Sequence, residues 1–142
     1  MNSGWVFLSM KEALKKGAVA FCLFVERKLV TVSFVAIDGA AVDGPWAGAL
    51  SDKEAYLGWM GSNLKYRRLS GGLGVHVYFE IIKYLRRRGF NACHFTVRKR
   101  NTTTRNTIAK KTGIEPYGEA LYLKVLWWKL WKEKPLPARV TE

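Results

Sequence analysis

Apolar and polar residues alternate with a helical period in the segment that follows the glycines at 71–74. Apolar residues recur there at intervals of three and four, and charged residues face the other way. The residues that set this spacing are Val75, Tyr78, Ile82 and Leu85. Gly89 follows three arginines, and glycine is common just beyond a helix end. We therefore expect a helix that starts at the glycines and stops at Gly89.

A strand is expected on each side of this helix. Residues Ala55 to Leu64 precede the glycines, Ala92 to Val97 follow Gly89, and both runs suit strands. A strand, a glycine-rich loop, a helix and a second strand form a βαβ unit. Its two strands should therefore be parallel neighbours with a right-handed crossover.

The first 50 residues supply the rest of the sheet. Ser9 to Glu12 has the pattern of a capping box and predicts a short helix that ends near Gly17. Ala18 to Val25 and Leu29 to Ile37 are apolar runs around three polar residues, which predicts an antiparallel hairpin. The expected fold is α/β: a mixed, twisted sheet with an antiparallel N-terminal hairpin and a central parallel βαβ unit.

The C-terminal segment combines tryptophans with lysines. Tyr117 to Val125 is expected to be a closing strand, whereas Leu126 to Trp131 fits both helical and strand spacing. We expect Leu126 to Trp131 to be buried, as a latch or a subunit contact, because soluble monomers rarely expose such apolar patches. The alternative is a membrane-surface segment, with tryptophans at headgroup depth and lysines toward anionic lipid.

Composition narrows the class of protein. A chain of 142 residues that is 49% hydrophobic is long enough for one domain with a real core. We divide it into a helix and hairpin (1–50), a core (54–114) and a closing strand with a Trp/Lys-rich tail (115–142). A formal charge of +13 at pH 7 predicts an anionic partner: a nucleotide-like cofactor, nucleic acid or an anionic membrane surface. Apolar runs are too short for a membrane span, and a cytoplasmic protein is expected.

The two cysteines do not predict a disulfide framework or a metal site. Cys22 and Cys93 are interpreted as buried thiols. Cys93 and His94 are adjacent in an expected strand, so their side chains point to opposite faces and cannot easily share one ion. The sequence therefore predicts no metal.

The glycine cluster is the strongest candidate for chemistry. Gly71, Gly72 and Gly74 lie at an expected helix start, just after Arg67 and Arg68. Unpaired N–H groups at a helix start attract phosphate, and glycines let phosphate approach the backbone. A tight turn that needs positive φ is the alternative explanation. The Rossmann pattern lacks its third glycine, and no Gly-Lys-Ser or Gly-Lys-Thr follows as in a P-loop.

Residues 54 to 114 resemble the core of the GNAT superfamily of N-acyltransferases, which use acyl-coenzyme A. Gly72-Leu73-Gly74 takes the glycine positions of the family's helix-start signature, and Gly89 takes the helix end. Asn101 and Gly113 match later positions of the pattern. The resemblance implies transfer of an acyl group, with acetyl preferred, from acyl-CoA to an amine of an unidentified acceptor.

The match has departures. Leu69 stands where the family has Arg or Gln, and Arg68 lies one residue early. Ala109 replaces the tyrosine that protonates the departing thiolate in many members. Tyr117 or Tyr122 could take over that role if the closing strand brings one of them near the sulfur.

The resemblance also implies where the coenzyme lies. The pantetheine arm would run beside the strand that ends at Leu64, and the pyrophosphate would sit on the amides of Ser70 to Val75. The predicted coenzyme-binding residues are Leu64, Arg68, Leu69, Ser70, Gly71, Gly72, Leu73, Gly74, Val75, Asn101 and Arg105.

Glu54 is the only carboxylate on the strand before the glycines and is the candidate base for the amine. At roughly 3.3 Å per residue, its distance from Leu64 leaves a water chain or catalysis by positioning alone equally open. Two other classes also stay open. One is a basic nucleic-acid-binding module that uses Arg98 to Lys111, and the other is a membrane-surface module that uses the Trp/Lys tail. A homodimer is a further option.

Overall fold

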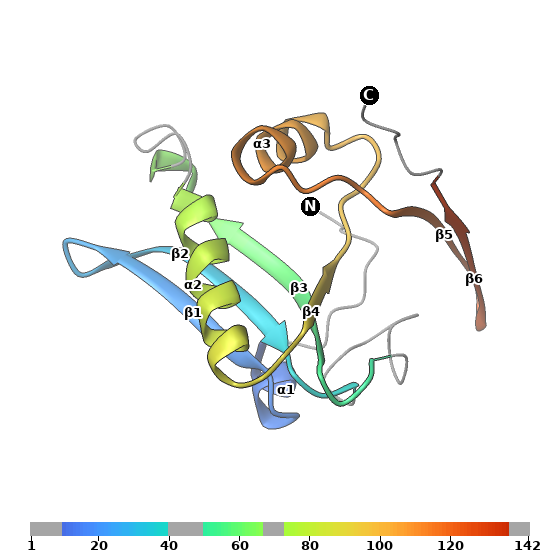
Figure 1. Ribbon diagram of the computed structural model, residues 1–142, viewed down its shortest axis with the longest axis horizontal. Coiled ribbons are helices and arrows are strands. Elements are labelled where there is room, and N and C mark those ends of the chain that lie inside the picture. Colours follow the sequence, from blue (N-terminus) through green and yellow to red (C-terminus); the bar gives the residue numbers. More distant parts are fainter. Residues whose placement is uncertain (1–9, 40–49, 67–72, 137–142) are drawn as a thin grey trace. The chain divides into compact units, whose positions relative to one another are not determined.

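The computed structural model describes residues 10–39, 50–66 and 73–136 (Figure 1). Its backbone divides into two compact units, residues 1–98 and 99–142, and each unit is described by itself. The division into a single domain with three parts stays a prediction. No helix within the described ranges is long and apolar enough to cross a membrane.

The first unit is a four-stranded sheet with two helices and a short 3-10 turn. Its elements are α1 (Met10–Lys15), β1 (Val19–Val25), β2 (Lys28–Ala36), β3 (Glu54–Ser62), the 3-10 turn (Leu64–Tyr66), α2 (Leu73–Arg87) and β4 (Ala92–Phe95). The strand order is β1-β2-β3-β4, with β3 and β4 parallel and the other pairs antiparallel. This arrangement confirms the predicted mixed α/β sheet, its N-terminal hairpin and its central parallel pair.

The hairpin between β1 and β2 closes through a two-residue turn. Val25 pairs with Lys28, and the turn residues Glu26 and Arg27 have φ of 48° and 63°. Positive φ at both positions matches the twist of the flanking strands in such turns. The polar residues that interrupt the apolar pattern therefore form the predicted reversal.

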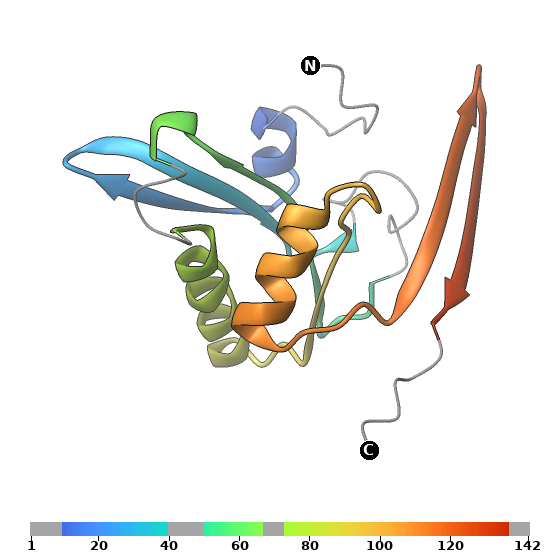
Figure 2. The same cartoon turned by 90° about the horizontal axis from the view of Figure 1, so that it is seen from above.

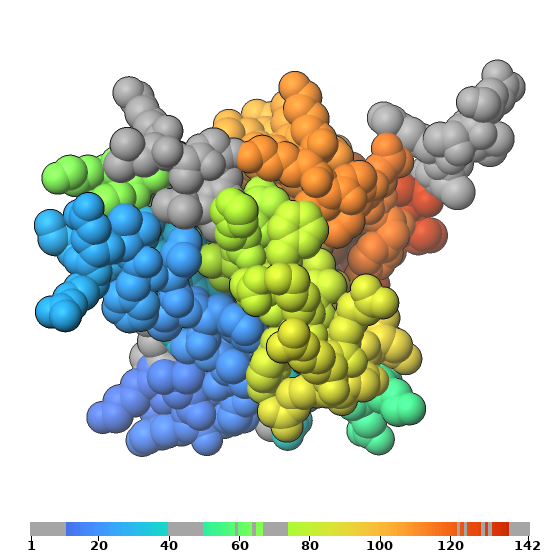
Figure 3. Space-filling view, turned by 60° about the vertical axis from the view of Figure 1, so that its left-hand side comes forward, coloured from blue at the N-terminus to red at the C-terminus, as the bar shows by residue number. Residues whose placement is uncertain are grey.

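The core of this unit lies between α2 and one face of the sheet. Val77, Ile81 and Leu85 of α2 pack against buried residues of β2 and β3, which are Val35, Ala55 and Leu57. A smaller cluster on the opposite face includes Ala18, Ala36 and Tyr56, with Ala13 of α1 packed against it. Figure 3 shows the outer side of α2 beside the β1–β2 hairpin. The buried face of α2 is therefore centred on Val77, Ile81 and Leu85, and it shares Leu85 and the half-buried Tyr78 with the stripe expected from the sequence.

The second unit holds α3 (Thr102–Thr112) and a hairpin of β5 (Gly118–Val125) and β6 (Trp128–Pro135). Gly113 ends α3 in the left-handed conformation, with φ of 69°. β5 pairs only with β6, in a sheet of its own. The strand expected from Tyr117 to Val125 is thus present as β5, and among the described residues its partner is β6 and not a strand of the four-stranded sheet.

The expected burial of Leu126 to Trp131 as a latch within the chain is wrong for the side chains that the structure describes. Leu126, Trp127 and Trp128 are 73%, 78% and 73% exposed, and Leu130 is 56% exposed. A two-stranded hairpin offers no second layer that could cover its own faces. Burial in a subunit contact stays a prediction.

Candidate cofactor site

A β-bulge interrupts β3 at Gly58. Leu57 pairs with Val35 and Trp59 pairs with Phe34, so Gly58 is an extra residue opposite β2. A bulge bends its strand and increases the local twist. It also reverses the alternation of side chains, so Met60 joins Ala55 and Leu57 in the cluster under α2.

The two parallel strands separate at this bulge. β4 pairs with β3 from Glu54↔Ala92 to Leu57↔Phe95, and no described residue of β3 beyond Leu57 pairs with β4. β3 nevertheless continues to Ser62 with β2 as its partner on the other side. Figure 1 shows β3 and β4 diverging from this point. Alternate backbone N–H and C=O groups of residues 58–62 thus face the opening, where an extended ligand could bind as an added strand.

The amino end of α2 lies against this part of β3. A Cβ atom on Gly74 would lie 3.3 Å from the Met60 sulfur, so the glycine allows the helix start to approach the strand closely. The first N–H groups of a helix have no intrahelical partner, and they carry the positive end of its dipole. The backbone amides of β3 beyond Leu57 and the amino end of α2 therefore lie close together.

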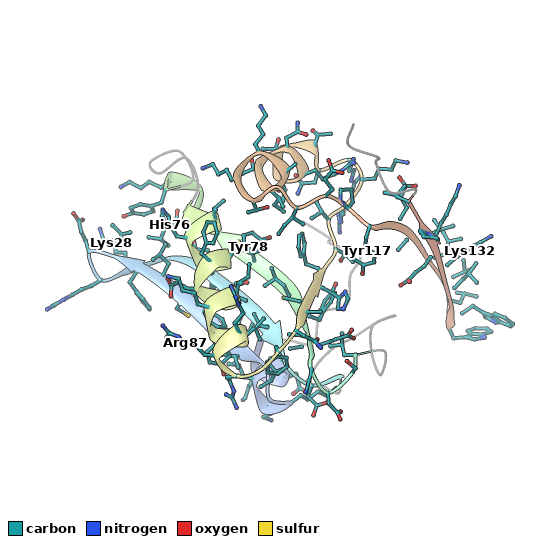
Figure 4. All side chains as sticks on the ribbon, viewed as in Figure 1. Lys28, His76, Tyr78, Arg87, Tyr117 and Lys132 are labelled. Carbon is teal, nitrogen blue, oxygen red and sulfur yellow. The ribbon has the colours of Figure 1, made fainter. Side chains whose placement is uncertain are left out.

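Two tyrosines mark the point where the strands separate. The Tyr56 hydroxyl lies 2.9 Å from the Thr96 hydroxyl, just past the end of β4. On the α2 side, the rings of Tyr78 and Phe95 lie 5.9 Å apart, and Figure 4 labels Tyr78 on α2. Burial raises the pKa of both tyrosines, so both phenols stay protonated at neutral pH.

Sequence reasoning missed this pair of tyrosines. It counted Tyr78 only as part of the apolar stripe, and it read Tyr56 only as a strand residue. The sequence did contain a signal for Tyr78. Tyr78 lies on the apolar face of a helix that follows the candidate phosphate loop, and a tyrosine hydroxyl on such a face needs a polar partner.

Part of the predicted coenzyme site lies within the described residues. β3 ends at Ser62, two residues before its predicted end at Leu64. Leu64 is instead the first residue of the 3-10 turn. Leu73, Gly74 and Val75 form the first turn of α2, as predicted. The other predicted residues of the loop lie outside the described residues: Arg68, Leu69, Ser70, Gly71 and Gly72.

Asn101 and Arg105 have local partners in the second unit. The Asn101 side chain caps α3 by accepting a hydrogen bond of 3.2 Å from the Thr104 N–H. The Arg105 guanidinium donates to the Lys99 carbonyl oxygen at 3.2 Å. Their role in coenzyme binding stays a prediction.

Glu54 lies at the amino end of β3, at the opposite end of the strand from residues 58–62. Its carboxylate accepts a hydrogen bond of 3.1 Å from the Ser51 N–H, and it lies 3.6 Å from His94 Nε2. The Ser51 hydrogen bond, helped by His94, lowers the pKa of Glu54. These contacts give Glu54 a structural role at the start of β3. Its role as a base stays a prediction.

Glu54→Gln tests these contacts through their pH dependence. Because the folded-state pKa is below the usual 4.5, the carboxylate stabilises the fold above that pH, and this stabilisation is lost as the pH falls. We expect Glu54→Gln to melt at a lower temperature than the parent at neutral pH and at the same temperature in acid. Glu26→Gln removes the same charge at the β1–β2 turn and is the control. A melting-temperature gap that widens in acid would contradict this assignment.

The cysteines differ in exposure, which corrects the prediction of two buried thiols. Cys22 is exposed, because its neighbours Phe21 and Leu23 pack under α2 and turn it to the opposite face of the sheet. Cys93 is half-buried, and burial raises the pKa of its thiol to about 11. Among the described residues, no group of His, Cys, Asp and Glu is arranged to hold a metal ion.

Native alkylation should therefore separate the two thiols. We expect iodoacetamide at neutral pH to modify Cys22 and to leave Cys93 intact, because the thiolate is the reactive form. Peptide mass spectrometry reads both positions, and alkylation in denaturant shows that both can react. Rapid native modification of Cys93 would show that this part of β4 is open to solvent.

Comparison with known proteins gives the fold. No protein-family model and no curated protein matches the sequence. Among solved structures, the aminoglycoside acetyltransferase meta-AAC0020 from an uncultured soil metagenomic sample, in complex with trehalose, matches with a TM-score of 0.63 and 14% identity. That match covers 88% of this chain and 79% of the other. This is a GNAT-like, acetyltransferase-type fold.

Two further structures agree with this fold. The same acetyltransferase in complex with sisomicin matches with a TM-score of 0.54 and 16% identity, over 75% of this chain and 64% of the other. A mutant of the BH1408 protein from Bacillus halodurans matches with a TM-score of 0.59 and 19% identity, over 82% and 72%. At these identities the GNAT-like fold is established, and the reaction is a separate question.

Proposed function

We propose that the protein transfers an acyl group, acetyl by preference, from acyl-CoA to an amine. The observation that carries this proposal is the separation of β3 and β4 at Gly58, beside the start of α2. Among the described residues, it offers a strand edge that β4 has left and a helix start within one unit. Pantetheine is an extended chain with amide groups, and pyrophosphate is an anion, so the two features suit the two parts of coenzyme A.

The same edge would serve the chemistry. In acyl transfer the amine nitrogen bonds to the acyl carbon, the carbon–sulfur bond breaks, and the thiolate leaves. Backbone N–H groups of residues 58–62 that face the opening can donate to the acyl oxygen as negative charge develops on it. Holding the amine and the acyl group in position supplies the rest of the rate increase.

Tyr78 is our candidate donor of the proton that the thiolate needs. Ala109 cannot supply that proton, whereas the Tyr78 phenol stays protonated at neutral pH and lies on α2 where the strands separate. Tyr117 and Tyr122 stay open as alternatives. The amine must lose its own proton, because a lysine-like amine has a pKa of about 10.4.

Charge bears on the class of acceptor. The acetyltransferase of similar fold was solved with sisomicin, an aminoglycoside. This chain carries a formal charge of +13, which repels acceptors with several positive charges. We propose an acceptor that carries its amine on a neutral or anionic molecule.

A thermal-shift screen with acetyl-CoA, longer acyl-CoAs and free coenzyme A tests the proposal. A ligand that binds only the folded state raises the melting temperature. We expect acetyl-CoA and free coenzyme A to raise it, and we expect amines to release the free thiol from acetyl-CoA in a coupled assay. No shift with any of these ligands would contradict the proposed function.

A further inference from the structure

The hairpin of β5 and β6 exposes a large apolar surface around its turn. Residues that pair across the two strands share a face, and Leu123↔Leu130 and Val125↔Trp128 are such pairs. Their side chains are all 47% to 73% exposed. Figure 2 shows the hairpin as a long, narrow ribbon. We call Leu123, Val125 to Trp128 and Leu130 the hairpin tip.

The turn of this hairpin consists of Leu126 and Trp127, and the backbone conformation at Leu126 is one that apolar side chains rarely adopt. Leu126 has φ of 52°, in the left-handed region that favours Gly and Asn. The β1–β2 turn has the same length and positive φ at both of its residues, and these are the polar residues Glu26 and Arg27. Strain that persists at an exposed leucine indicates a function for that side chain.

The charges around the tip have one sign. Lys124 and Lys129 occupy paired backbone positions next to the turn. Lys132, labelled in Figure 4, lies further along β6. The sequence from Ala120 to Lys132 contains no Asp or Glu. The only charges in this stretch of sequence are positive, which favours an anionic surface as the partner of the tip.

We propose that the hairpin tip inserts into the headgroup region of a membrane rich in anionic lipid. Tryptophan is favoured at that depth, and lysines beside the tip would meet lipid phosphates. A second copy of the chain fits less well, because two basic hairpins repel each other. A flat contact between strand faces would also leave Leu126 and Trp127, which lie beyond the last strand pair, in water.

Vesicle flotation tests this proposal with the full chain and without coenzyme A, so its outcome is independent of the acyl-transfer proposal. The probes are phosphatidylcholine vesicles with and without phosphatidylglycerol. The test variant Leu126→Gly/Trp127→Asn replaces the apolar turn by one that favours two-residue hairpins with positive φ at the first residue. The matched control Glu26→Asn/Arg27→Gly places the favoured residues for its own turn geometry in the β1–β2 turn, without changing the net charge.

We expect the parent and the control to float with the anionic vesicles. The test variant should bind at least about tenfold more weakly, because two large apolar side chains no longer enter the interface. Replacing Lys124 by Gln should weaken binding to anionic vesicles about fivefold and leave binding to phosphatidylcholine unchanged.

Two results would overturn the proposal. One is a parent protein that does not float, or a test variant that floats as well as the parent. The other is a parent dimer in size-exclusion chromatography that the test variant converts to a monomer while neither protein binds vesicles. That second result would assign the hairpin tip to a subunit contact.

Discussion

Gly72→Asp should abolish acetyl-CoA binding without destabilising the protein. Gly72 immediately precedes Leu73, the first residue of α2. An Asp at that position can cap the helix and suits its dipole, so the melting temperature should be kept or raised. The same carboxylate would oppose the pyrophosphate, and like charges placed together cost several kcal/mol, which is roughly a hundredfold or more in Kd.

Calorimetric titration with acetyl-CoA measures this effect. Asn91→Asp is the matched control, because it adds the same charge at the amino end of β4, away from the opening. We expect the control to bind acetyl-CoA nearly as well as the parent. A Gly72→Asp protein that binds as tightly as the parent would place the phosphate site elsewhere.

Ile81→Ala should remove much of the stability of the first unit. Ile81 is 1% exposed and lies in the cluster that joins α2 to β2 and β3. Truncation of a buried isoleucine costs about 2–5 kcal/mol, against a total of about 5–15 kcal/mol for a typical domain. Urea denaturation should show this loss directly.

Ile82→Ala is the control for that loss. It is the same substitution in the same helix, at a half-buried position outside the cluster. We expect its cost to be less than half that of Ile81→Ala. Equal losses at the two positions would mean that α2 does not pack on the sheet through the Ile81 face.

The parts of the fold that depend on local spacing could be predicted from the sequence. The stripe that includes Val75 and Leu85 gave α2, and Gly89 follows its end with φ of 80°. The polar residues Glu26 and Arg27 marked the first hairpin, because they interrupt two strand-forming runs. The parallel pair followed from the order of strand, helix and strand.

The parts that depend on non-local register could not be predicted. The bulge at Gly58 depends on how β3 pairs with β2, and the separation of β3 from β4 depends on the last strand pair, which involves Phe95. Neither pairing can be read from the spacing of residues within one strand. The tail was harder for a different reason, because the residues around Trp127 fit both periods. Their expected burial followed from apolar composition alone, which does not show what would cover them.

The central claim is that coenzyme A binds along the edge of β3 beyond Leu57, where β4 no longer pairs with it, and at the start of α2. Hydrogen–deuterium exchange with and without acetyl-CoA tests it most directly, because backbone amides that gain partners exchange more slowly. We predict slower exchange for alternate amides of residues 58–62 and for the first turn of α2 after Leu73, with no change in the β1–β2 hairpin. Saturating acetyl-CoA that protects only other segments, or that protects none, would contradict the account.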